Sequence, residues 1–314
     1  PTAANYDPNA TMDDGSCIYC NINDSVVFNY TGSMQTYTVP AGVTSVTIQT
    51  FGASGGDAWY CGATGGQGAI MQGDFQVVEG DVLNILVGGQ GSVAVDAFGN
   101  ENGGGGGGTF VVDNSGNPLI VSGGGGGATS NISYCGSNLF GMNASIDSSG
   151  TMSSDGLGSG GISGNGGQTY SNYGGAGGGF FTDGIPASSV ISVGQSYLNG
   201  GMGGLDYNSY GADGGFGGGG AGWRTGGNGG GGGGYSGGGA SGDYPYAGGG
   251  GGGSLNLGVN QVNTVGNVGN GLVIISYATS TCTGCTDSSA LNYDSLALFD
   301  DGSCVYCTLS TSIM

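Results

Sequence analysis

Basic side chains are almost absent from this chain of 314 residues: Lys and Arg together number 1, and there is no His. Asp and Glu number 21, so the net charge at pH 7 is −20. Without His, the chain itself cannot build a Ser–His–Asp or a Cys–His catalytic arrangement. Its negative charge also repels phosphate groups. We therefore expect neither an enzyme nor a nucleic-acid-binding protein.

Long apolar runs are missing as well. None approaches the ~20 residues that a membrane-spanning helix needs, so direct insertion into a membrane is not expected. No segment has the periodicity of a long α-helix. Hydrophobic residues still make up 37% of the chain, which is too many for a plain Gly/Ser linker.

Glycine is what the chain has in excess, with 81 residues. An ordered glycine costs about 0.5–1 kcal/mol more backbone entropy than alanine, and contacts between backbones must offset that cost. Left-handed extended helices with three residues per turn point their N–H and C=O groups outward, and only glycine lets such helices bond side by side. We expect a bundle of polyglycine-II helices, with a flexible linker as the alternative. The tracts are 103–108, 123–127, 217–220, 229–234 and 248–253.

Between the tracts, apolar residues alternate as they do in β-strands. In VTSVTIQTF, for example, Val46 and Ile48 share one face. The predicted strands lie within 26–51, 69–78, 82–88, 109–112, 119–122 and 272–277. Seven aromatic residues are expected to pack along the flanks of the bundle: Phe51, Trp59, Phe180, Phe181, Phe216, Trp223 and Tyr235. The predicted fold class is mainly β, with almost no α-helix.

A short motif occurs twice. Residues 3–20 and 290–307 share 12 of 18 residues at an offset of 287. The predicted organisation is the end of one Cys/Asp-rich joint repeat (1–22), a glycine-rich domain (23–278), a complete joint repeat (279–310) and the start of a next domain (311–314). We expect this to be one period of a longer tandem array.

The eight cysteines fall into pairs, which favours disulfides and an extracellular, oxidising compartment. In the second joint repeat, nested bonds Cys285–Cys304 and Cys282–Cys307 are one of three possible connectivities. Cys17 and Cys20 of the first repeat are expected to have partners before residue 1. Cys61 and Cys135 are expected to bridge two glycine-rich loops.

Calcium is the one cofactor that the sequence suggests, because Ca²⁺ prefers carboxylate and carbonyl oxygens. The spacing lacks the full pattern of an EF-hand loop, and the alternative is that Asp-Asp-Gly-Ser forms a turn. Without calcium, no cofactor is expected. The candidate ligands are Asp7, Asn9, Asp13, Asp14, Asp287, Asp294, Asp300 and Asp301.

The order of motifs resembles the glycine-rich domain family, over about residues 23–278. The motifs are VPAGVTSVTIQTFGASGG, VVEGDVLNILVGGQG, LIVSGGGGG, FGGGGAGWRTGG and GLVIISY. The family includes the extracellular region of the anaplastic lymphoma kinase and leukocyte tyrosine kinase receptors, bacterial surface proteins and, more loosely, phage tail adhesins. The resemblance implies a tumour-necrosis-factor-like (jelly-roll) β-sandwich whose loops expand into a polyglycine-II bundle, flanked here by small disulfide-braced motifs. The joint repeat is similar to repeats in secreted proteins of Bacteroidetes, which implies a place at the cell surface.

These observations predict a structural module, repeated through disulfide-braced joints in an extracellular bacterial fibre or giant surface protein. Its partners would be neighbouring copies of itself. The alternative is an adhesin that binds a surface glycan or protein through the tips of the glycine helices and Tyr-rich loops. The tyrosines considered for that role are Tyr170, Tyr173, Tyr207, Tyr210, Tyr244 and Tyr246.

Overall fold

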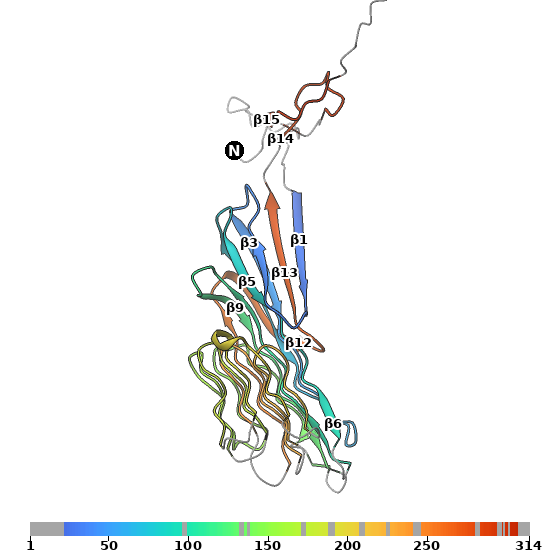
Figure 1. Ribbon diagram of the computed structural model, residues 1–314, viewed down its shortest axis with the longest axis vertical. Coiled ribbons are helices and arrows are strands. Elements are labelled where there is room, and N and C mark those ends of the chain that lie inside the picture. The colour runs from blue at the N-terminus through green and yellow to red at the C-terminus, as the bar shows by residue number, and fades with distance from the viewer. Residues whose placement is uncertain are drawn as a thin grey trace, which may run out of the picture.

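The computed structural model is mainly β (Figure 1). It describes residues 22–95, 99–131, 135–136, 139–170, 174–187, 192–206, 211–223, 227–240, 246–279, 283–293, 297, 299–300 and 302–306. No α-helix occurs in these ranges, as predicted. The elements are β1 (Ile22–Asn29), β2 (Gln35–Thr38), β3 (Ser45–Phe51), β4 (Gly68–Gln76), β5 (Val82–Leu86), β6 (Val93–Val95), β7 (Glu101–Gly103), β8 (Thr109–Val112), β9 (Pro118–Ser122), β10 (Thr129–Ser130), the 3₁₀ helix η2 (Tyr197–Asn199), β11 (Leu255–Asn256), β12 (Val259–Asn267), β13 (Leu272–Thr279), β14 (Thr283–Gly284) and β15 (Phe299–Asp300).

Two five-stranded antiparallel sheets face each other. Sheet I has the order β1-β13-β3-β4-β12, and sheet II has the order β11-β9-β8-β5-β2. The alternation predicted for β3 is present, since Val46 and Ile48 are buried and pack with Ile85 of β5 and Val111 of β8. One apolar core therefore lies between the two sheets. A third, smaller antiparallel sheet, which we call the tip sheet, has the order β10-β7-β6.

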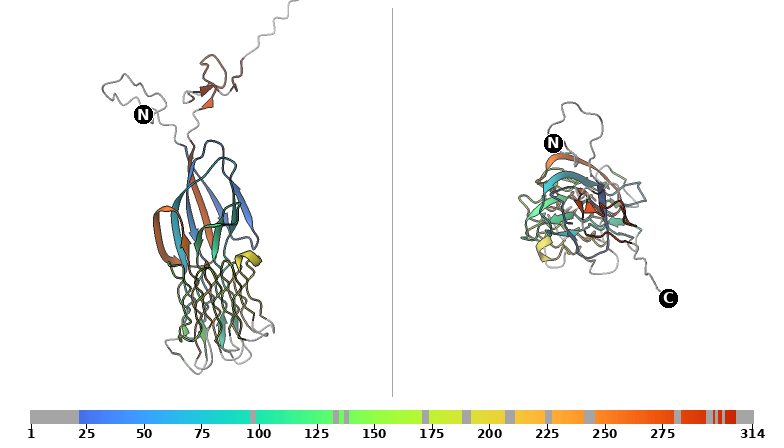
Figure 2. Two further views of the ribbon diagram at one scale, coloured as in Figure 1. Left: turned by 90° about the vertical axis from the view of Figure 1, so that its left-hand side faces the viewer. Right: turned by 90° about the horizontal axis from the view of Figure 1, so that it is seen from above.

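The glycine tracts run side by side from the sandwich to the tip sheet (Figure 2, left). In tract 103–108 the partners of the backbone N–H groups repeat every three residues. The first and fourth N–H groups donate to 123–128, the second and fifth to 89–92, and the third and sixth to 217–220. The distances from N to O are 2.8–2.9 Å. The carbonyls accept from three further segments, which are 53–56, 213–215 and 229–234. The tract thus has neighbours on all sides.

Close backbone approach explains why these positions are glycine. A Cβ atom added at Gly105 would collide with the carbonyl oxygen of Gly231, and one at Gly106 with that of Ala53. Real Cβ atoms cannot occupy those positions unless the neighbouring backbone moves. Hydrogen bonds between backbones therefore replace the side-chain packing that an ordinary core provides.

A second apolar cluster joins the outer face of sheet II to the bundle. Phe110 of β8 lies there with Phe180 and Phe216, and the ring of Phe180 stacks on Tyr197 with centroids 5.0 Å apart. The predicted flank packing holds for Phe180, Phe216 and the partly buried Tyr235. It is wrong for Trp59, which is 70% exposed because it sits in the turn between the bridged residues Ala58 and Ala63. Phe181 is 48% exposed, although its edge still contacts Phe180.

The start of β1 and the end of β13 lie together, at the pole of the sandwich opposite the glycine bundle (Figures 1 and 2). β1 and β13 pair antiparallel over eight residues, from Ile22 with Thr279 to Asn29 with Leu272. The chain therefore enters and leaves the domain at neighbouring points. The bundle extends away from those points.

Candidate functional site

The described part of the second joint repeat is a small loop closed by the disulfide Cys285–Cys304. This is one of the two bonds predicted for the repeat. β14 and β15 pair in parallel beside it. The other predicted bond, Cys282–Cys307, lies outside the described residues, as do Cys17 and Cys20.

Asn292 holds the two halves of this loop together. Its Nδ2 donates to the carbonyl of Ser303 and its Oδ1 accepts from the N–H of Val305, each over 2.8 Å. Asn5 occupies the matching position in the first copy. In the second copy, the hydrogen bonds of Asn292 link the Asn-Tyr-Asp motif to the Asp-Asp-Gly-Ser-Cys motif and so close the loop.

Asp287 anchors the other side of the loop. Its carboxylate accepts from the N–H and hydroxyl of Ser289 at 2.8 and 2.7 Å, and from the hydroxyl of Tyr306 at 2.8 Å. The bonds from Ser289, followed by that from Tyr306, lower the pKa of Asp287. The bond to Asp287 raises the pKa of Tyr306.

The predicted calcium ligands are not assembled into a cluster where the structure describes them. Asp300 accepts from the N–H of Gly302 at 3.0 Å, and Gly302 has φ +76°, as in a turn. Within the described ranges, no three His, Cys, Asp or Glu side chains form a set that could hold a metal ion. Calcium stays a prediction, because the remaining candidates lie outside the described residues: Asp7, Asn9, Asp13, Asp14, Asp294 and Asp301.

The far end of the bundle, which we call the tip, is tied by the disulfide Cys61–Cys135. This bond joins two loops, as predicted. Ala58, Ala63, Ala128 and Leu139 form a small buried cluster beneath it, with Tyr246 packed against them. Glu101 of the tip sheet accepts from the N–H of Tyr60 at 2.7 Å. The turn that carries Trp59 and Tyr60 is therefore fixed to the tip sheet.

Aromatic rings stand out into solvent at the tip. Trp59, Tyr60 and Tyr170 are 70%, 58% and 58% exposed. Of the tyrosines predicted for ligand binding, Tyr170 is thus accessible, whereas Tyr246 packs on the tip cluster. The sequence pattern did not single out Tyr60, although its place beside Cys61 in a glycine-flanked loop was a usable signal. Tyr173, Tyr207, Tyr210 and Tyr244 lie outside the described residues.

No protein-family model matches this chain, and no curated protein is recognisably similar to it. Among the described residues, no helix has the length and apolar character that crossing a membrane requires.

Proposed function

We propose that the chain is a structural repeat module of an extracellular bacterial array, in which joint repeats form the spine and each glycine-rich domain projects from it. The observation that carries the proposal is the pairing of β1 with β13 over their whole length. Because the chain enters and leaves the domain at one pole, successive domains joined through it would stand beside the line of joints. The offset of 287 residues between the two joint copies would be the length of one repeat of the array.

The internal build of the domain supports this role. The three-residue period of bonding partners in tract 103–108 is what polyglycine-II helices would give. Two sheets of five strands, with the first and last strands of the sandwich adjacent, support a jelly-roll of the tumour-necrosis-factor type and membership of the glycine-rich domain family. Cross-bonded backbones make a stiff rod. With a single Lys or Arg in the chain, proteases that cut at basic residues find almost no target.

Electron microscopy of the native, non-reduced protein tests the proposal. We expect a regular array with one lateral projection for each joint repeat. Domains strung end to end along the fibre axis would contradict the predicted geometry. Separate particles of the chain's own mass, 30.2 kDa, would overturn the array itself.

The second candidate is an adhesin, and the exposed rings at the tip favour it. Trp59, Tyr60 and Tyr170 offer aromatic faces at the end of the domain that is farthest from the joint. Aromatic side chains dominate many recognition surfaces. On this hypothesis, Trp59→Ala would abolish binding to an array of defined surface glycans and proteins, while Val78→Ala, at an exposed turn of the sandwich, would not.

A further inference from the structure

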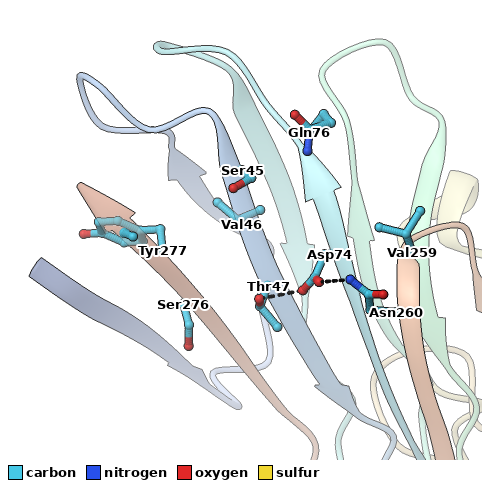
Figure 3. A pocket seen from close by; sticks show the side chains of 10 residues that line it. Ser45, Val46, Thr47, Asp74, Gln76, Val259, Asn260, Ser276 and Tyr277 are labelled. Atoms are coloured by element: carbon cyan, nitrogen blue, oxygen red, sulfur yellow. Dashed lines mark hydrogen bonds between the residues drawn. The ribbon is translucent and has the colours of Figure 1, made fainter. Parts of the chain in front are cut away.

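A hollow lies on the outer face of sheet I, and its lining combines polar side chains with Val46, Val259 and Tyr277 (Figure 3). Its volume is about 390 Å³, which is near the lower end of ligand-pocket volumes. A row of directly paired residues crosses its floor, from Ser276 of β13 to Thr47 of β3 and Asp74 of β4. Gln76 and Ser45 form a second pair beside this row. With Asn260 of β12, which also lines the hollow, four strands place hydroxyl, amide and carboxylate groups at one spot.

Asp74 is the centre of this arrangement. Thr47 donates its hydroxyl to Asp74 Oδ1 at 2.6 Å, and Asn260 donates from Nδ2 to Asp74 Oδ2 at 2.9 Å (Figure 3). The bonds from Thr47 and then Asn260 lower the pKa of Asp74, which keeps the carboxylate ionised and a pure hydrogen-bond acceptor at neutral pH. Each oxygen retains acceptor capacity beyond these bonds.

Asn260 reaches Asp74 because β12 is irregular at that point. The register of β12 against β4 shifts between Val259 and Val262, and Asn260 has φ 50°. That left-handed conformation is disfavoured for residues other than glycine, although Asn tolerates it better than most. Bulges redirect side chains, and strained residues gather at functional sites.

A network of amides holds the irregular segment in place. Gln261 donates from Nε2 to the carbonyls of Asn256 and Gly258, each at 2.9 Å. Asn256 donates from Nδ2 to Asn263 Oδ1 at 2.8 Å. The position of Asn260 is therefore fixed by its neighbours before any ligand arrives, which reduces the ordering cost of binding.

The polar groups of the lining favour one ligand class. Asp74 is the one charged side chain among the lining residues, and it is negative, so an anionic ligand is repelled. An apolar ligand would leave the polar floor unpaired. Within the described residues, the hydroxyls of Ser45 and Ser276 have no hydrogen-bond partner, which leaves them able to donate and accept. A ligand that presents several neighbouring hydroxyl groups can use the carboxylate, amide and hydroxyl groups together.

We propose that this hollow is a binding site for a neutral sugar residue of a surface or matrix polysaccharide, with Asp74 accepting from two adjacent sugar hydroxyls and Asn260 positioned to bond to a third. The proposal goes beyond the array function and does not depend on it. A spine that repeats the domain would present many such sites, so weak individual binding would be strengthened by multivalency.

Saturation-transfer NMR with the methyl glycosides of glucose, galactose, mannose and N-acetylglucosamine tests the site on the full chain. We expect saturation of at least one glycoside by the wild type. Asp74→Asn and Asn260→Gly should each weaken that binding by about tenfold or more, since each removes a fixed polar contact. Glycine suits φ 50°, so the Asn260→Gly variant should keep its melting temperature.

Two control variants distinguish this hollow from the tip and from a general effect of charge. Glu79→Gln removes the same single charge from an exposed turn and should leave binding unchanged. Trp59→Ala at the tip should also leave glycoside binding unchanged. Loss of binding by this variant would place the sugar site at the tip and overturn the proposal. Saturation by none of the four glycosides, equal binding by Asp74→Asn, or binding of n-butylammonium in place of sugars would also overturn it.

Discussion

Ile22 and Thr279 are paired at the outer ends of β1 and β13, so the first and last strands of the sandwich meet at one pole of the domain. From that pair the register runs without a shift to Asn29 and Leu272. A force applied at residues 22 and 279 therefore acts on the pair at its open end. In that geometry the hydrogen bonds of β1 and β13 are loaded in sequence and not all together.

The first prediction concerns this direction of loading. Pulling between residues 22 and 279 in a force-spectroscopy experiment should separate β1 from β13 at low force, because one pair of residues carries the load at a time. Pulling between residue 22 and residue 60 at the tip loads the sheets and tracts lengthwise, so many hydrogen bonds must break together. We expect a clearly higher unfolding force in that direction. Equal unfolding forces along the two directions would contradict the sequential loading of the hydrogen bonds between β1 and β13.

The second prediction concerns close approach inside the bundle. Gly105→Ala should lower the free energy of unfolding by about 3 kcal/mol or more, because the new methyl group collides with the carbonyl of Gly231 and the tract cannot move without breaking bonds to its neighbours. Gly116→Ala is the matched control. Gly116 has φ +85° and open space around it, so alanine there should cost only about 1 kcal/mol. Denaturant unfolding of both variants would measure the difference, and similar losses would argue against a tightly packed bundle.

The third prediction concerns the disulfide at the tip. Cys61 and Cys135 are separated by 74 residues, and closing a loop of that length in the unfolded chain is worth about 4 kcal/mol in the chain-entropy model. Replacing both with serine should lower the melting temperature of the main domain.

The matched control for the tip disulfide is the removal of Cys285–Cys304. That bond closes a loop in the joint, with a separation of 19 residues. Its loss should leave the main thermal transition unchanged and speed proteolysis only within 283–306. If both removals lowered the main transition equally, the joint and the glycine-rich domain would unfold as one unit.

Much of the sandwich could be predicted. β3, β4, β5, β8, β9 and β13 lie within about two residues of their predicted positions. Alternation placed β3, whereas β8 and β9 were placed by the turn residues between them and β13 by its apolar run. β12 was missed for a physical reason. It is an edge strand whose side chains are mostly exposed, and its register shifts at Asn260 break the period of two. The strained asparagine that builds the proposed sugar site also hides the strand from a pattern search.

The sequence predicts that a glycine bundle exists, but it does not show where the bundle ends. Glycine runs mark its centre, where every neighbour is another backbone. At its periphery a side chain can point away from the bundle, so residues such as Thr151 also take part, donating from the N–H to the carbonyl of Gly251 at 2.8 Å. Composition alone does not distinguish such a segment from a loop. The same ambiguity explains Trp59, which follows the glycine-containing segment 52–58 yet lies in the turn between the bridged residues Ala58 and Ala63.

The last prediction concerns a buried hydroxyl in the core. The Tyr37 side chain is 6% exposed, and its hydroxyl has no hydrogen-bond partner, while its ring meets Phe28 edge to face at 6.3 Å. Tyr37→Phe keeps the ring and removes the unpaired group. We therefore expect a gain of about 1 kcal/mol in the free energy of unfolding at neutral pH.

The pH dependence of Tyr37→Phe provides an independent check. Burial, followed by the nearby Tyr277 and Asp24, raises the pKa of Tyr37 from 10.0 to about 12. Between those values the unfolded chain releases the proton while the folded chain retains it. The stability associated with this group is therefore complete below about pH 10 and is lost as the pH rises through about 12. The Tyr37→Phe variant should therefore lose less unfolding free energy than the wild type over this pH range, since the other tyrosines titrate alike in both proteins. Parallel curves for the two proteins from pH 9 to 12 would mean that the Tyr37 hydroxyl reaches solvent.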